Sequence, residues 1–564
     1  MVPVRLGQAI GKTCRYGSAD GGVRKAPKHE STEGGEMRKR RHAGTRCVSG
    51  GPIVRKTPGE DEYVIPSVLP SEVRHAIKSV KNRTAPGPDR IRPEHLKNLP
   101  TALVSTLARL FTRYLSECKV PTQWKTSRTV LLYKKGDPQD MGNYRPICLL
   151  SVVYKLFTRV ILNRIERTLD EGQPCEQAGF RKGFSTIDHI YTLSPGSLKY
   201  HESTRCLSVS RSSISRKPST PLRQKQSWKL WATRVISPFY DDITIDVRRG
   251  VRQGDTVSPK LFTATLEDVM RRLEWDNMGV RVDGRLLHHL RFADDIVLIT
   301  PSISQAERML ADFDDACGKI GLQLNLTKTM FMRNGWVPDA PFSLNGTTIS
   351  ECSSYVYLGR EVNMMNDLAP ELGRRKRAAW GAYKSIEDVV KKTKNIRLRA
   401  HLFNTTVLPA LTYASETWAL RKQDENAVSV IERSIERVML GMTRLTQVRA
   451  GIRSSTLRQQ SKIRDAAVYA KSSKIRWAGH VMRPNDHRWT RAVSDWTPRN
   501  VKRTTGRPPT RWSDFFTKSF KKRYDTLRVS RTDRTHWTTL ARERDKWKDC
   551  WRPLGLPNDQ RESR

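Results

Sequence analysis

The sequence predicts an α+β chain in which a strand pair that carries two carboxylates is surrounded by amphipathic helices. Three observations predict it. The stretch 291–299 places two adjacent acids, Asp294 and Asp295, between two apolar runs, which is the pattern of a strand-turn-strand hairpin. Apolar residues recur at helical spacing over 149–169 and 303–320. The last third of the chain is mostly helical and basic in pattern.

The charge of the chain limits its partners. Its 564 residues carry 102 Lys and Arg against 57 Asp and Glu, a formal net charge of +45, so we expect a polyphosphate partner such as nucleic acid. No apolar run reaches the roughly 18 residues of a membrane-spanning helix. The nine cysteines are scattered, without a Cys-x-x-Cys pair, and no signal-peptide core is present. We therefore expect an intracellular protein, in the nucleus or the cytoplasm, with no membrane contact and no clear protein partner.

The N-terminal part begins without apolar periodicity. Residues 1–60 are rich in Gly, Lys and Arg, and we expect disorder there. The basic run at 38–41 is either a nuclear localisation signal or an ordinary basic cluster. Order should then begin with a short helix over 71–80, followed by a rigid Pro-Gly-Pro turn within 84–89 and a helix over 103–115.

A predicted buried strand over 129–133 leads into basic residues. Lys134 follows the strand directly, and Arg145 precedes Pro146 at a rigid step. Arg offers a planar fork and Lys a mobile point charge, so the pair can hold a triphosphate. The alternative is that both are solvated surface residues.

Asp294 and Asp295 are the candidate metal ligands. Two like charges at the rim of a core repel each other and lose solvation, so a cation is expected between them. Carboxylate oxygens suit Mg²⁺ or Mn²⁺. The alternative is an ordinary exposed turn.

Further hairpins are predicted at Asp283-Gly284 and Asn345-Gly346, and Ser302 should cap the helix after the carboxylate hairpin.

The order of these blocks resembles the reverse transcriptases of non-LTR retrotransposons, of the LINE-like, RTE type. The motifs that carry the resemblance are Ala85–Asp89, Asn143–Pro146, Gln177–Arg181, Gly250–Phe262, Phe292–Asp295, Gly321–Thr329 and Tyr355–Gly359. The resemblance implies a right-hand polymerase with fingers, a palm with an antiparallel sheet and a helical thumb. It also implies a DNA primer extended on an RNA template from dNTPs, with two Mg²⁺ or Mn²⁺ ions.

The same resemblance implies roles for single residues. Asp294 and Asp295 would be catalytic metal ligands, and Lys328 would protonate the pyrophosphate. The nucleotide-binding residues would be Lys134, Arg145, Gln253 and Gly254. The contacts with template and primer would come from Arg181, Tyr357, Leu358 and Gly359.

One motif of the family is not found. In the family, a strand close to Phe-Ile-Asp-Leu-Lys-Lys-Ala-Phe-Asp carries the third metal-binding carboxylate. Residues 194–231 contain no such strand by pattern, are rich in Ser and Arg, and hold one acid, Glu202. A natural insertion and a shifted reading frame both explain this tract. The codons of Ser213–Thr220 can spell Ile-Asp-Leu-Lys-Lys-Ala-Phe-Asp in a neighbouring frame, which favours the frameshift. The tract is also shorter than in the family, so the helix after that strand is expected to be lost.

The C-terminal region has the composition of a single-strand binder. Residues 471–523 hold 15 Lys and Arg against 3 Asp, and four indoles are interspersed among them, at Trp477, Trp489, Trp496 and Trp512. Guanidinium groups can hold phosphates and indoles can stack on bases, which makes Arg476 and Trp477 candidate contacts. The alternative is a basic helical domain whose tryptophans form the core. Gly506-Arg507-Pro508 resembles the minor-groove tripeptide of AT-hooks.

These observations predict four regions. They are a disordered basic segment (1–60), fingers and palm (61–362, with an aberrant tract at 194–235), a helical thumb (363–460) and a basic Trp-containing region (461–564). The expected function is RNA-directed DNA polymerase, impaired here because the first catalytic Asp is not found. The alternatives are a catalytically dead element fragment and a basic nucleic-acid-binding protein on a polymerase scaffold.

Overall fold

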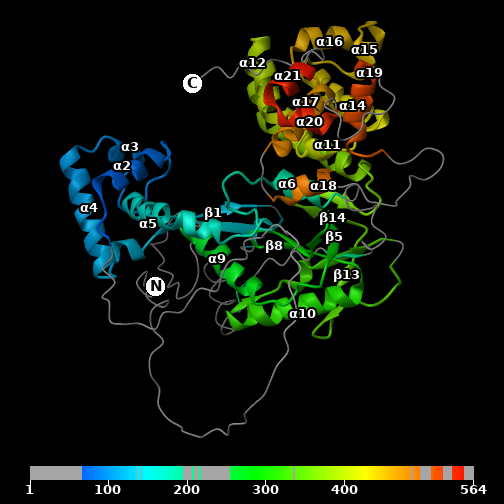
Figure 1. The fold of residues 1–564 in the computed structure, drawn as a ribbon. Coiled ribbons are helices and arrows are strands. Elements are labelled where there is room, and N and C mark those ends of the chain that lie inside the picture. Colours follow the sequence, from blue (N-terminus) through cyan, green and yellow to red (C-terminus); the bar gives the residue numbers. More distant parts are fainter. Residues whose placement is uncertain are drawn as a thin grey trace, which may run out of the picture. The chain divides into compact units, whose positions relative to one another are not determined.

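The chain divides into two compact units in a computed structural model (Figure 1). One unit contains 1–166 and 228–258, and the other contains 167–227 and 259–564. The structure describes residues 66–134, 136–140, 143–194, 206–208, 215–216, 254–334, 337–483, 487–495, 510–524 and 536–551. The predictions that lie outside these residues are those for 1–60, 38–41, Gln253, Trp496 and Arg507.

Helices that enclose one apolar cluster build the first unit. They are α2 (Pro70–Ser79), α3 (Pro93–Lys97), α4 (Thr101–Ser116) and the first part of α5 (Val152–Glu171). In α4, Val104, Ala108, Phe111 and Leu115 are buried at helical spacing, because these positions share one face of the helix. The cluster includes these residues and Phe157 of α5. The predicted helices over 71–80, 103–115 and 149–169 are therefore confirmed.

The Pro-Gly-Pro turn packs directly against the start of α5. A Cβ at Gly87 would lie 2.6 Å from the backbone of Leu150 and Ser151, so only glycine fits. The Ser151 hydroxyl donates a hydrogen bond to Asp89 over 2.6 Å. The turn is thus fixed by close backbone packing.

A two-stranded hairpin completes the described part of this unit. β1 (Arg128–Tyr133) pairs antiparallel with β2 (Tyr144–Leu149), which confirms the predicted strand. The prediction that this strand is buried is wrong, because Val130, Leu132 and Tyr133 are 40%, 52% and 49% exposed. An apolar run indicates burial only when both faces of a strand are covered, and no third strand pairs with this hairpin among the described residues.

A five-stranded sheet forms the centre of the second unit. Its order is β13 (Ser350–Glu351), β10 (Met330–Arg333), β3 (Cys206–Ser208), β8 (Asp295–Thr300) and β7 (His289–Phe292). All neighbours are antiparallel except β10 and β13, which are parallel. The palm was predicted to hold the carboxylates on an antiparallel sheet, and the strands around Asp295 agree.

Strand β8 is buried on both faces. Ile296 and Leu298 join a cluster with α9 (Ser258–Arg271) and α10 (Ile303–Lys319). Val297 and Ile299 point to the opposite face, because side chains alternate along a strand, and they join a different cluster. The continuous apolar run after the carboxylates is therefore explained by a strand covered on each side.

The tract 194–231 contributes strands to the sheet. The sequence of this tract lacks the family's Asp-bearing strand pattern, and neither described strand carries an acid: β3 lies between β8 and β10, and β4 (Ser215–Arg216) pairs with β9 (Leu322–Gln323). Without β3, the facing edges of β8 and β10 would leave backbone N–H and C=O groups unpaired inside the unit. Pairing these backbone groups favours a strand at 206–208, although the sequence of the tract has a poor strand pattern. The expected position of the missing Asp, at Ser213 and Ile214, lies outside the described residues.

Two further hairpins turn where the sequence predicts. β5 (Val280–Val282) and β6 (Arg285–Leu287) flank Asp283 and Gly284, whose φ values are 51° and 79°. β11 (Ser343–Leu344) and β12 (Thr347–Thr348) flank Asn345 and Gly346, at 49° and 76°. Positive φ at both positions is typical of the two-residue turns that Asp-Gly and Asn-Gly favour. The Ser302 hydroxyl accepts a hydrogen bond from the N–H of Gln305, so the predicted cap of α10 is confirmed as well.

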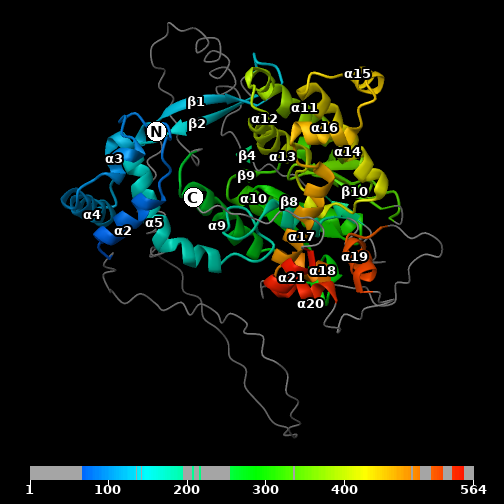
Figure 2. The ribbon, with the colours of Figure 1, turned by 90° about the horizontal axis from the view of Figure 1, so that it is seen from above.

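The remainder of the second unit is mostly helical. After the hairpin of β14 (Ser354–Tyr357) and β15 (Arg360–Asn363) come α11 (Ala369–Lys392), α12 (Ile396–Leu402), α13 (Leu408–Leu411), α14 (Lys422–Met439), α15 (Arg444–Arg449), α16 (Ser454–Ser461), α17 (Ala466–Met482), α18 (Trp489–Asp495), α19 (Asp514–Tyr524), α20 (Trp537–Arg542) and α21 (Arg544–Trp551). Figures 1 and 2 show α17, α20 and α21 side by side. None of the helices in the described part of the chain is long and apolar enough to cross a membrane.

Candidate functional site

The two candidate metal ligands lie at the tip of the β7–β8 hairpin. Phe292 pairs with Asp295, so Ala293 and Asp294 form a two-residue turn. Ala293 has a φ of 59°, as such turns require at their first central position. Asp294 is exposed, and Asp295 is partly exposed as the first residue of β8. Both carboxylates therefore stand at the open end of two buried strands.

A neighbouring segment holds this turn in place. The N–H of Arg291 donates to the carbonyl of Glu176 over 2.8 Å, and the N–H of Ala178 donates to the carbonyl of Arg291 over 3.0 Å. Between them, the fully buried Gln177 accepts hydrogen bonds at Oε1 from the N–H of Ala293, 3.2 Å away, and from its own loop. The segment that was predicted to contact the template is thus a structural neighbour of the carboxylates. The role of Gln177 was missed by sequence reasoning.

Gly179 makes the closest contact between this segment and the turn. A Cβ at Gly179 would lie 2.3 Å from the backbone nitrogen of Ala293. We expect Gly179→Ala to lower the free energy of unfolding by about 1–3 kcal/mol, because the backbone at Gly179 and the backbone at Ala293 must move apart to admit the new methyl group. Chemical unfolding measures this free energy. Gly318→Ala in α10 is the control, since nothing lies within 4 Å of its Cβ; equal stability of the two variants would contradict the packing described here.

A buried ion pair lies beneath the hairpin. Arg291 is fully buried, and its Nη2 donates to the carboxylate of Glu267 on α9. Burial and then the charge of Arg291 lower the pKa of His189 to about 3, and the same two causes lower the pKa of His289 well below its ordinary value. Both imidazoles are therefore neutral near pH 7, and the guanidinium is the positive charge of this group.

The turn between β14 and β15 lies close to the carboxylates. Burial, followed by the negative charge of Asp295, raises the pKa of the Tyr357 hydroxyl. Tyr357 is 2% exposed, so its side chain belongs to the core, and the contact with the primer that was predicted for this residue stays a prediction. Leu358 and Gly359 form the turn itself, with φ values of 44° and 88°, and remain partly exposed. The hydroxyl of Tyr413 donates to the carbonyl of Leu358 over 2.8 Å and fixes the turn.

The described nucleotide-binding candidates all lie in the first unit. Arg145 pairs with Leu132 across the hairpin, and Lys134 follows β1 two residues later. Alternation therefore places Lys134 and Arg145 on one face, as diagonal neighbours, and both are exposed. Gly254 has a φ of 108°, and a Cβ there would lie 2.7 Å from the carbonyl oxygen of Cys148. Glycine at this position is thus required by the packing of the loop.

The remaining predicted contacts have different environments. Arg181 is partly buried, and its Nη1 donates to the carbonyl oxygens of Pro174 and Gln177 over 2.5 and 3.1 Å. Its guanidinium also lies 4.3 Å above the ring of Phe184. Arg181 therefore shapes its own loop. Lys328 is exposed at the end of a short 3-10 helix, Leu326–Lys328.

The prediction that Trp477 binds nucleic acid is wrong. Trp477 is 9% exposed, and its indole N–H donates to the carboxylate of Asp188. Trp489 donates to Glu176, and Trp512 is buried in the same cluster. That cluster also contains residues of β7 and β8, so these indoles build the core behind the carboxylate hairpin. The alternative interpretation, a basic region with core tryptophans, is the correct one for them, while Arg476 is exposed.

The carboxylates of Asp294 and Asp295 have the hard oxygen donors that a divalent cation prefers. Within the described ranges no group of three or more His, Cys, Asp or Glu side chains is placed to hold a metal ion. The described residues thus supply two of the three acids expected from the family.

Comparison with known proteins decides the family. Residues 133–362 match the family model of reverse transcriptase (RNA-dependent DNA polymerase). A transposon-derived protein of Caenorhabditis elegans is 37% identical over 272 residues, which cover 48% of this chain and 96% of that protein. The chain belongs to the reverse transcriptase family. The family implies a right-hand polymerase fold, and the mixed helix and strand content of this chain agrees with it.

Longer relatives carry names from non-LTR retrotransposons. A protein named as a probable RNA-directed DNA polymerase from transposon BS of Drosophila melanogaster is 25% identical over 422 residues, covering 67% of this chain and 45% of the relative. The Pol polyprotein from type-1 retrotransposable element R2 of Popillia japonica is 27% identical over 285 residues, covering 46% and 38%. The chain therefore spans less than half the length of these two relatives.

Proposed function

We propose that the chain derives from the RNA-directed DNA polymerase of an RTE-type non-LTR retrotransposon, and that its site for nucleotidyl transfer is the β7–β8 hairpin. The observation that carries the proposal is the pair Asp294 and Asp295 at the tip of a buried hairpin, whose apolar cluster also contains Tyr357 at the end of β14. Its substrates would be an RNA template, a DNA primer and dNTPs. The net charge of +45 supports polyphosphate partners.

Each residue has a role in this proposal. Asp294 and Asp295 would hold two Mg²⁺ or Mn²⁺ ions, which would supply activation of the primer 3′-OH and neutralisation of phosphate charge. Lys134 and Arg145 bind the triphosphate from one face of the β1–β2 hairpin, with Gln253 and Gly254. Lys328 donates a proton to the leaving pyrophosphate. Leu358 and Gly359 contact the primer.

We further propose that this chain has lost most of its activity. The family's third carboxylate is missing from the tract 194–235, which fits a shifted reading frame. In that case the chain is a catalytically dead fragment that retains nucleic-acid binding. The observation that favours this second interpretation is the composition of residues 194–231, which are rich in Ser and Arg and hold one acid, Glu202.

Metal binding tests the proposed site without requiring catalysis. We expect the Asp294→Asn, Asp295→Asn double variant to bind Mn²⁺ at least about tenfold more weakly than the wild type, because both carboxylates are removed. Calorimetric titration measures the affinity. The control is Asp314→Asn with Asp315→Asn in α10, which removes the same charge from adjacent acids that diverge around a helix. If both double variants bind Mn²⁺ equally well, the hairpin is not the metal site.

A further inference from the structure

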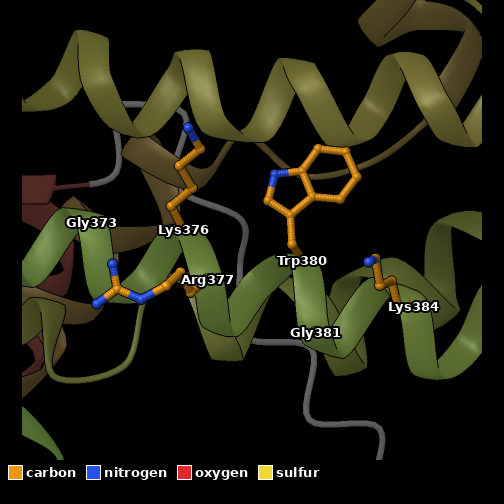
Figure 3. Close-up of a pocket in the computed structure, with 6 residues that line it drawn as sticks. All are labelled: Gly373, Lys376, Arg377, Trp380, Gly381 and Lys384. Carbon is orange, nitrogen blue, oxygen red and sulfur yellow. The ribbon is translucent and has the colours of Figure 1, made fainter.

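The structure contains a second group of cations with an indole, on helix α11. We call it the α11 groove, a hollow of about 600 Å³. Its lining residues are Gly373, Lys376, Arg377, Trp380, Gly381 and Lys384. These positions recur at spacings of three and four, so they share one face of the helix. Figure 3 shows them along a single stretch of α11, with Lys376 and Trp380 pointing to the same side.

The charges of the groove are available to a ligand. Lys376, Arg377 and Lys384 are exposed, and none of the described acidic side chains forms an ion pair with them. Other cations of the same helix are engaged differently: Arg375 donates to the carbonyl of Gly359 and pairs with Glu371. Three cations without acidic partners on one face attract a polyanion.

Trp380 adds an aromatic surface between these cations. It is partly buried and meets Tyr383 edge-on, with ring centroids 6.2 Å apart. An indole beside guanidinium and ammonium groups is the combination that binds unpaired bases by stacking and their phosphates by charge. The sequence predicted this combination in the C-terminal region, where the three described indoles, Trp477, Trp489 and Trp512, are buried.

The two glycines have no packing reason among the described residues. A Cβ at Gly381 would meet nothing within 4 Å, and one at Gly373 would meet only the end of the Arg377 side chain, at 3.8 Å. Glycine is a poor helix former, so its presence twice inside a 24-residue helix weakens that helix. What Gly381 does provide is open space beside Trp380, and Gly373 leaves the helix surface open about two turns away, so that a ligand's backbone can approach.

We propose that the α11 groove binds one unpaired nucleic-acid strand, with a base stacked on Trp380 and phosphates at Lys376, Arg377 and Lys384. The proposal deepens the proposed function, because it rests on nucleic acid as the partner and names a strand contact outside the carboxylate hairpin. From Gly373 to Lys384 the helix extends about 16 Å, enough for more than one phosphate.

The test is to measure the affinity of the protein for a short, fluorescently labelled single strand. The measurement uses fluorescence anisotropy, with a chelator present. Trp380→Leu should weaken the affinity roughly fivefold or more, and Trp380→Phe should retain most of it, because a phenyl ring still stacks. Gly381→Leu should also weaken binding by filling the groove. Its thermal stability should not fall, since leucine is the better helix former.

A charge comparison separates the groove from general attraction. Lys376→Ala, Arg377→Ala and Lys384→Ala together should lower the slope of log affinity against log salt by roughly two, at about 0.7 per phosphate contact of a single strand. The control removes three exposed cations that lie outside the groove, at Lys392, Lys394 and Arg397. An equal loss in this control, or unchanged binding by the groove variants, would overturn the proposal.

Two further comparisons separate stacking on an unpaired base from duplex binding and from metal binding. A blunt duplex of the same length should bind the Trp380→Leu variant almost as well as the wild type, and an equal loss on duplex and single strand would refute stacking on an unpaired base. The chelator removes divalent ions, so a failure of the carboxylate hairpin as a metal site leaves these measurements unchanged. The two proposals can therefore fail separately.

Discussion

A chain in which residues 194–235 are replaced by their in-frame reading, with the lost helix restored, should extend a primer at least about a thousandfold faster than the chain as given. The restored Asp would supply the third metal-binding carboxylate. Metal ions stabilise charge in the transition state of phosphoryl transfer, so losing a ligand should cost several kcal/mol of barrier. Single-turnover primer extension on an RNA template measures the difference.

The position of β3 supports this expectation. Cys206–Ser208 pairs antiparallel with β8, the strand that begins at Asp295, so the tract crosses the sheet beside the carboxylate hairpin. The register runs from Cys206 opposite Thr300 to Ser208 opposite Leu298, so β3 is directed toward the end of β8 that carries Asp295. If the chain as given extends a primer as fast as the restored one, another acid, such as Asp241 or Asp242, supplies the ligand, or the proposed alignment of the palm is wrong.

The second large effect concerns stability. Arg291→Met should lower the free energy of unfolding by about 3 kcal/mol, because it removes the buried partner of Glu267 and leaves that carboxylate paired only with Arg271, whose side chain is 60% exposed. Replacing both partners, as Arg291→Met with Glu267→Leu, should cost less than the single change. Urea unfolding measures all three proteins. A double variant that is less stable than Arg291→Met would show that the pair is not the source of the effect.

The same helix provides a matched control for this experiment. Arg272 and Asp268 also form an ion pair on α9, but their side chains are 71% and 63% exposed. Solvent screens such a pair, so Arg272→Met should change stability by less than about 1 kcal/mol. A similar loss in both methionine variants would mean that the helix, and not the buried charge, responds to the substitution.

The sequence predicted the parts of the fold that depend on local patterns. Asp283-Gly284 and Asn345-Gly346 form the expected turns because two successive positive φ values are a local requirement. Helix α4 lies where its apolar spacing places it. The carboxylate turn follows from two acids between apolar runs, a pattern that forces the chain to the surface between two buried strands.

The features that the sequence did not predict depend on partners far along the chain. Tyr357 and Trp477 were expected at a nucleic-acid surface, yet both are buried, because β7, β8 and the C-terminal helices share one apolar cluster. An isolated aromatic residue in a basic stretch does not reveal whether another segment covers it. One signal was available: Arg291 stands beside a buried apolar run, and a charge in such a place requires a partner like Glu267.

The central claim is that Asp294 and Asp295 are the metal ligands of a polymerase. Primer extension by the restored chain, compared with the restored chain that carries Asp294→Asn and Asp295→Asn, tests it most directly. We predict template-directed DNA synthesis by the first protein and a fall to background in the second, in Mg²⁺ and in Mn²⁺ alike. Equal synthesis by both proteins would contradict the claim.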